Sequence, residues 1–125
     1  MAGVLGEIVV DCQDPLLVGR FWSAVLGWPL AETDRGYCWL SSTGEPAARP
    51  LLVFVPVAEP KSGKNRIHID VNPWGCEQPE ELERLLALGA RPVDVGQGEV
   101  PWVVLADPEG NEFRLLGRQA KSSAS

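Results

Sequence analysis

A two-residue pattern of apolar and polar positions, interrupted by Val9 on the polar face, runs over residues 7–12. Ile8 and Val10 fall on one face of this segment, and Glu7 and Asp11 fall on the other. This two-residue period predicts a β-strand with one buried face and one polar face.

The pattern then changes to helical spacing. Asp14 is a favourable N-cap, and Pro15 suits the first helical position. Apolar residues recur at intervals of three or four from Leu17 to Val25, and Gly27 supplies a C-terminal stop. We therefore predict a helix between Pro15 and Gly27.

Three strands are predicted after this helix. The first starts at Trp28, the second spans Tyr37–Ser41, and the third is the strongly apolar segment Leu51–Val57. Residues 42–49 between the last two have the composition of a loop.

The same order restarts after a polar connector at residues 60–64. Ile67 and Ile69 alternate with His68 and Asp70, which predicts another half-polar strand. The second set of predicted elements comprises a strand at 66–71, a helix that Pro79 opens and Leu88-Gly89 ends, and strands at 91–95, 103–106 and 112–116.

A strand, a helix and three strands thus occur twice. The two Leu-Gly stops end at Gly27 and Gly89, 62 positions apart (89 minus 27), close to half of the 125 residues. We predict an α+β fold of two tandem βαβββ modules, whose curled mixed sheets surround a cleft and carry the helices outside. The predicted single domain covers residues 1–118, with modules at about 5–58 and 65–117, and residues 119–125 form a flexible tail.

Composition narrows the range of functions. A net charge of −6 argues against binding to nucleic acid or to an anionic membrane surface. No apolar run is long enough to span a bilayer, and the N-terminus does not resemble a signal peptide. Three widely spaced cysteines, of which Cys12 lies on an apolar strand face, fit a reduced compartment. We therefore expect a cytoplasmic protein.

The candidate chemistry lies on the polar strand faces. His68 is the only histidine, and it is interpreted either as a metal ligand or general base or as a hydrogen-bonded residue of a polar groove. Glu7 is a candidate ligand, base or salt-bridge partner of Arg66 or Arg114, and the salt bridge is favoured. Asp70 either orients a substrate or caps a loop.

Arg114 and the aromatic residues are candidates for ligand binding. Arg114 can bind a carboxylate or phosphate with its forked guanidinium, or neutralise Glu7 or Glu112. Core filling is the default for each of the five tryptophans, but some can line an apolar pocket for a flat ligand. The predicted substrate-binding aromatic residues are Trp39, Phe54 and Trp102.

Three segments together resemble the glyoxalase / bleomycin-resistance / extradiol-dioxygenase (vicinal oxygen chelate) superfamily. They are the helix Asp14-Pro15 to Leu26-Gly27-Trp28, the strand Lys64–Asp70, and the hairpin Ala106-Asp107-Pro108-Glu109-Gly110-Asn111-Glu112-Phe113. The likeness runs from about Gly6 to Leu116 and is greatest to short actinobacterial glyoxalase-like proteins. It implies paired βαβββ modules around a cleft and, by analogy, a homodimer.

The resemblance also implies where a divalent metal would bind. The ligand positions of metal-using members match Glu7 and His68 here, but the closing glutamate falls at about Arg114. The segment Leu51–Val57 offers no carboxylate or imidazole. A metal held by Glu7 and His68 alone lacks the three protein ligands typical of a catalytic site, and Arg114 would repel it.

Two functions follow from these arguments. The favoured one is a glyoxalase-like protein that binds a small organic molecule in the cleft, without a full catalytic metal site or other certain cofactor. The alternative is a lyase, isomerase or ring-modifying enzyme, in which Glu7 and His68 act as acid and base or as partial ligands of a divalent ion.

Overall fold

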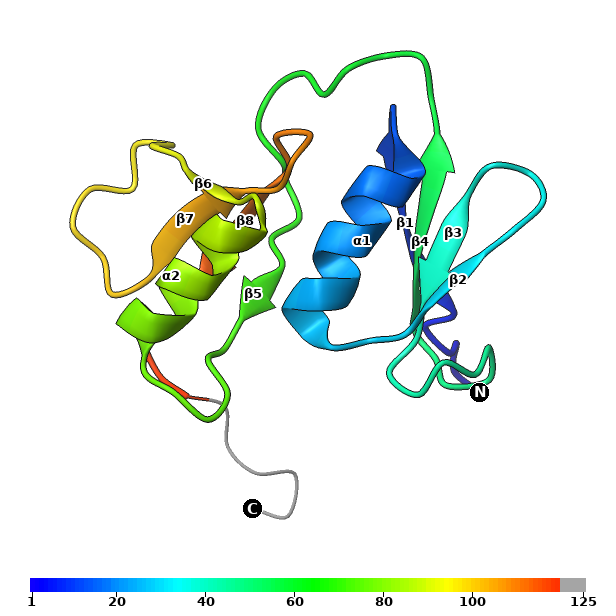
Figure 1. Ribbon diagram of the computed structural model, residues 1–125, viewed down its shortest axis with the longest axis horizontal. Coiled ribbons are helices and arrows are strands. Elements are labelled where there is room, and N and C mark those ends of the chain that lie inside the picture. Colours follow the sequence, from blue (N-terminus) through cyan, green and yellow to red (C-terminus); the bar gives the residue numbers. More distant parts are fainter. Residues whose placement is uncertain (120–125) are drawn as a thin grey trace. The chain divides into compact units, whose positions relative to one another are not determined.

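The computed structural model describes residues 1–119. These residues divide into two compact units, and the boundary in the sequence lies between Lys61 and Ser62. The first unit contains β1 (Glu7–Cys12), α1 (Pro15–Leu26), β2 (Leu30–Glu32), β3 (Cys38–Leu40) and β4 (Leu51–Pro56). The second contains β5 (Asp70–Val71), α2 (Gln78–Leu88), β6 (Arg91–Pro92), β7 (Val103–Ala106) and β8 (Glu112–Leu115) (Figure 1). Neither helix is long and apolar enough to cross a membrane.

Each unit has one four-stranded mixed sheet, and the two sheets share a topology. The strand order is β1-β4-β3-β2 in the first sheet and β5-β8-β7-β6 in the second. The outer strands β1 and β5 run parallel to β4 and β8, and the remaining pairs are antiparallel. The α+β fold and its duplicated βαβββ modules are therefore confirmed. The shared cleft stays a prediction, and all of the predicted tail except Gln119 lies outside the described residues.

Helix α1 forms where the capping signals predict it. The Asp14 side chain accepts a hydrogen bond from the Leu17 amide at 3.2 Å, and Gly27 ends the helix with a left-handed backbone (φ 69°). Gly19 lies so close to the sheet that a Cβ atom there would be 2.5 Å from the Cys38 Sγ. The helix therefore packs tightly on the first sheet.

The core of the first module is centred on β4. Four consecutive β4 residues, from Leu51 to Phe54, are buried, so both faces of this strand are covered. Phe54 is fully buried, and its ring lies close to Gly19 of α1. Trp22 and Cys12 are also buried, as their apolar positions predict.

The second module has a smaller core. Leu85 of α2 and Phe113 and Leu115 of β8 are almost completely buried. The other buried side chain of α2 is Glu81, whose two carboxylate oxygens accept hydrogen bonds of 2.7 and 2.8 Å from Arg84. This bidentate pair lets the helix bury a charge that would be costly alone.

Strand β5 is shorter than the alternation predicts. The predicted strand at 66–71 is reduced to Asp70 and Val71, and Ile67, assigned to the apolar face, is exposed. Parallel pairing with β8 reaches only this end of the segment, beginning with the bond from the Arg114 amide to the Ile69 carbonyl. Without a neighbouring strand the preceding residues cannot form a ladder, whatever their periodicity.

The hairpin between β7 and β8 forms where the turn residues of the sequence predict it. Asp107 is fully buried, and its carboxylate accepts hydrogen bonds from the Glu109 and Asn111 amides at 2.9 and 3.0 Å. An aspartate that bonds to backbone amides further along the turn fixes its geometry. This turn holds β7 and β8 in register, and both strands carry site residues.

Candidate functional site: a pocket on the second sheet

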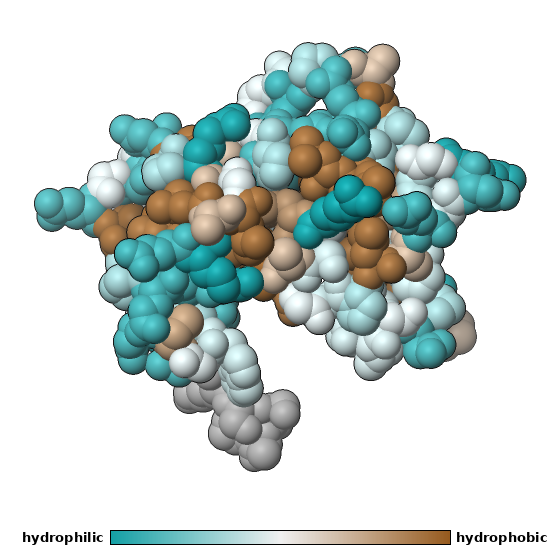
Figure 2. Space-filling view, in the orientation of Figure 1, coloured by the Kyte–Doolittle hydropathy of each residue, from teal (hydrophilic) through white to brown (hydrophobic). Residues whose placement is uncertain are grey.

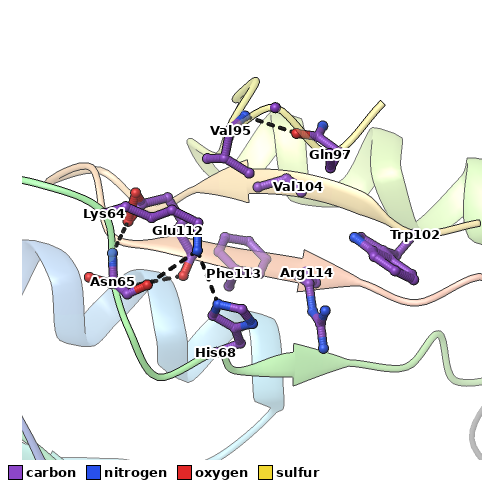
Figure 3. Close-up of a pocket in the computed structure, with 11 residues that line it drawn as sticks. Lys64, Asn65, His68, Val95, Gln97, Trp102, Val104, Glu112, Phe113 and Arg114 are labelled. Carbon is purple, nitrogen blue, oxygen red and sulfur yellow. Dashed lines mark hydrogen bonds between the residues drawn. The ribbon is translucent and has the colours of Figure 1, made fainter. Parts of the chain in front are cut away.

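A pocket of about 240 Å³ lies on one face of the second sheet, within the second module (Figure 3). In the sheet register Asp70 of β5 lies beside Arg114 of β8, which in turn lies beside Val104 of β7. These three residues form one row across the sheet. The row brings together side chains that are far apart in the sequence, which is why spacing alone does not reveal the pocket.

The apolar part of the wall comes from β7, the segment before it and a neighbouring loop. Val104 and Trp102 line the pocket together with Val95, and Phe113 contributes from β8. Gln97, on the same loop as Val95, accepts a hydrogen bond from the Val95 amide at 2.8 Å and so stabilises the loop beside the pocket. Apolar walls with a few polar groups are typical of small-molecule sites.

The polar part contains a lysine–histidine contact. The Lys64 Nζ lies 3.2 Å from the His68 Nε2, and it also lies 3.4 Å from the Asn65 carbonyl oxygen (Figure 3). A lysine ammonium can only donate hydrogen bonds. With Lys64 protonated, the His68 Nε2 therefore acts as the acceptor in this contact.

The segment that carries Lys64 is attached to β8. The Asn65 amide donates to the Glu112 Oε1 at 3.1 Å, and the Asn65 side-chain nitrogen donates to the Glu112 carbonyl oxygen at 3.3 Å. Two bonds between the same residues hold the segment at the pocket edge although it forms no strand there. Glu112 thus serves to position Lys64.

Arg114 is held by two different partners. Its Nε and Nη2 donate to the two carboxylate oxygens of Asp70 at 2.6 and 2.7 Å, and its guanidinium lies 5.0 Å from the centre of the Trp102 ring. The bidentate bond and the ring contact together fix the guanidinium. Hydrogen bonding from Arg114 lowers the pKa of Asp70 below its ordinary value, so this carboxylate is ionised at neutral pH.

The ion pairs differ from those considered from the sequence. Arg114 pairs with Asp70 and not with Glu112 of its own strand. Within the first module, the Glu7 Oε1 lies 3.6 Å from the Arg49 Nη1. The polar-face pattern placed Asp70 and Arg114 on one side of their strands, but the pairing depends on the register of β5 with β8, which the pattern does not contain.

The remaining predicted aromatic residues belong to the first module. Phe54 is fully buried in the core and faces α1. A ligand could contact its ring only if the helix moved away from the sheet. Trp39 is partly exposed on β3, in register with Val53 of β4. The pocket on the second sheet therefore brings together His68, Arg114 and Trp102 from the predicted set, with Asp70 behind Arg114.

The donor groups around this pocket do not fit a divalent ion. One ring nitrogen of His68 is bonded to the Lys64 ammonium, and both oxygens of Asp70 are bonded to Arg114. The Glu112 Oε1 accepts a hydrogen bond from the Asn65 amide. Two cationic side chains in the pocket would repel a metal ion. In the described part of the chain no group of three or more histidine, cysteine, aspartate or glutamate residues is arranged to hold one.

Sequence reasoning missed several pocket residues. Lys64 and Asn65 stand directly before the His68 segment, but nothing in their spacing indicates a contact with His68 or with Glu112. Val95 was assigned to a predicted strand at 91–95, but β6 ends at Pro92, and Val95 and Gln97 lie in an irregular loop. The one available signal was the alternation of Glu112 with Arg114 on the last strand, which put both side chains on one face.

Comparison with known proteins agrees with this architecture. The model of the Glyoxalase-like domain family matches residues 7–116. No curated protein sequence matches the chain. Because the family match covers most of the sequence, the chain belongs to the Glyoxalase-like domain family, and the superfamily resemblance is confirmed.

Solved structures of related fold cover nearly the whole chain. A fosfomycin resistance protein FosX from Listeria monocytogenes, a mutant in complex with Mn(II) and a dihydroxypropylphosphonic acid, is 15% identical with TM-score 0.66, covering 95% of this chain and 92% of that one. FosX from Mesorhizobium loti is 12% identical with TM-score 0.67, covering 99% and 96%. A glyoxalase/bleomycin resistance protein/dioxygenase family enzyme from Burkholderia phytofirmans is 19% identical with TM-score 0.63, covering 90% and 97%. At these identities the likeness establishes the fold alone.

Proposed function

We propose that this protein binds a small organic molecule in the pocket of its second module, without a full catalytic metal site. The observation that carries the proposal is one pocket wall that combines an apolar surface, made by Trp102 and Val104, with the fixed polar groups of Lys64, His68 and Arg114. Its volume of about 240 Å³ is below the roughly 300–1,000 Å³ of drug-sized sites, which favours a compact ligand.

A ligand screen tests this function. The full chain is titrated calorimetrically with a panel of compact aromatic acids, amides and amines. A true ligand loses about tenfold in affinity, equivalent to about 1.4 kcal/mol, when Trp102→Ala removes the apolar wall. The matched control is Trp74→Ala, because Trp74 belongs to the same module, is 68% exposed and does not line the pocket.

The outcomes separate pocket binding from other contacts. Affinity lost in the Trp102 variant and kept in the Trp74 variant supports the proposal. Equal losses in both variants, or no binding by any member of the panel, contradict it.

An enzyme of the same superfamily is the second candidate. It is favoured by the exposed imidazole of His68 in the pocket and by the Mn(II) complex of the FosX relative. In that version Glu7 and His68 act as acid and base or as partial ligands of a divalent ion. A metal content near one ion per chain, lost in both Glu7→Ala and His68→Ala, would replace the metal-free proposal with this one.

The assembly and location are also part of the proposal. We infer a homodimer by analogy with the superfamily, although fold alone does not determine assembly. The cytoplasmic location is inferred from the three widely spaced cysteines. Light scattering of the purified chain gives its mass directly. A mass of about twice the 13.6 kDa of one chain supports the dimer, and a mass of one chain contradicts it.

A further inference from the structure

The Lys64 ammonium is positioned in the pocket wall without a carboxylate partner among the described residues. Both of its hydrogen bonds go to uncharged acceptors, the Asn65 carbonyl oxygen and the His68 Nε2. An ammonium group has three N–H donors, so one donor remains. Lys64 and His68 are both exposed, and a molecule entering the pocket can therefore reach this donor.

The other charged groups of the pocket are engaged differently. Arg114 is neutralised by Asp70, whose two oxygens accept its hydrogen bonds. Glu112 accepts the Asn65 amide and anchors the segment that bears Lys64. Among the described residues that line the pocket, Lys64 is thus the one cationic side chain whose hydrogen-bond partners are all neutral.

We infer, on the basis of the proposed function, that the ligand carries an anionic oxygen, such as a carboxylate or a phenolate, on a compact apolar ring. The anion binds the Lys64 ammonium, and the ring lies against the wall of Trp102 and Val104. A hydrogen bond between two charged groups is stronger than one between neutral groups. His68 positions the ammonium by accepting one of its hydrogens.

The probe for this inference is 2-naphthoate, and its neutral isostere 2-naphthamide is the comparison. Calorimetric titration of the full chain measures both affinities at neutral pH. We expect the carboxylate to bind at least about tenfold more tightly than the amide. The variant Lys64→Met, which keeps most of the length of the side chain and removes its charge, brings the carboxylate affinity down to that of the amide and leaves the amide affinity unchanged.

A matched variant controls for net charge. Lys61→Met removes the same charge three positions earlier, from a lysine that does not line the pocket, and keeps the preference for the carboxylate. An equal preference for carboxylate and amide in the unaltered protein overturns the inference, as does an unchanged preference in Lys64→Met. Tighter binding of 2-naphthylmethylammonium than of 2-naphthoate overturns it as well, because the cation would then be recognised through Glu112.

Failure of this inference is distinguishable from failure of the proposed function. If amides or amines bind in the pocket and lose affinity in Trp102→Ala while the carboxylate has no advantage, the function stands and the anionic ligand is rejected. If no compound responds to Trp102→Ala, both are rejected.

Discussion

In the first module, β4 is buried on both faces, whereas in the second module β8 buries one face and presents Glu112 and Arg114 on the other. The space-filling view shows hydrophobic and hydrophilic residues interspersed over the visible surface (Figure 2). Helix α1 buries six residues, and α2 buries only Glu81 and Leu85. The same βαβββ topology therefore serves packing in one copy and a polar pocket in the other. The topology fixes the order of the strands, but the residue types on the outward face determine whether a sheet packs into the core or lines a pocket.

The strongest test of this contrast is Phe54→Ala in the first core. Removing a fully buried ring should cost about 3–5 kcal/mol of unfolding free energy. Chemical denaturation of the full chain measures the loss. Phe54→Leu, which retains most of the volume, is the control and should leave ligand affinity in the second module unchanged. A large loss of affinity in Phe54→Leu would mean that this residue serves ligand binding after all.

The close approach of α1 to its sheet gives the next largest effect. Gly19→Ala places a Cβ atom 2.5 Å from the Cys38 Sγ and 3.1 Å from a Leu30 methyl carbon, so the helix must shift. We expect a loss of about 1–3 kcal/mol. Adding Cys38→Ala should restore part of this loss in a double-mutant cycle. Simple additivity of the two changes would show that the contact does not limit the packing.

The ion pair of the second module should respond to pH. Because Arg114 lowers the folded-state pKa of Asp70, the pair stabilises the fold fully above the unfolded-state pKa of aspartate. That contribution is lost as the pH falls through the lower folded-state value. Asp70→Asn should therefore be less stable than the parent at pH 7, and the difference should shrink towards zero in strong acid. A difference that does not change with pH would exclude the charge of Asp70 as its source.

Thiol labelling gives the smallest effect and compares the modules directly. Cys12 and Cys38 are buried in the first module, and burial together with Glu32 raises the pKa of Cys38. Cys76, in the second module, is half-buried, and desolvation followed by Glu81 raises its pKa. In the native protein we expect Cys76 to react with a maleimide first, yet more slowly than free cysteine. Faster labelling of Cys38 than of Cys76 would contradict the packing of the first module.

Much of the fold is predictable from local rules. The predicted strand at 7–12 matches β1 in its bounds, although Ile8 on the predicted apolar face is 40% exposed, and Asp14 with Gly27 marks both ends of α1. These features depend on neighbours in the sequence, such as a cap and its nearby amide. The start of β5 and the end of β6 depend on pairing across the sheet, so periodicity overestimated the length of β5 and extended the strand at 91–95 into the loop that contains Val95.

The candidate site was predictable only in part. His68, Arg114 and Trp102 could be proposed from residue type and strand face, and all three line the pocket. The pairing of Arg114 with Asp70 and the contact of Lys64 with His68 arise from strand register and from a short irregular segment. Neither contact can be predicted from residue spacing in the sequence. Both contacts determine which charged groups of the pocket are available to a ligand.

The most direct test of ligand binding in the second module is a nuclear magnetic resonance titration of the full chain. The indole N–H signals of the tryptophans are followed while 2-naphthoate is added. Binding in the pocket predicts a shift of the Trp102 signal that saturates, while the signals of Trp22 and Trp39 stay in place. A saturating shift of Trp39 with an unmoved Trp102 signal would contradict the account.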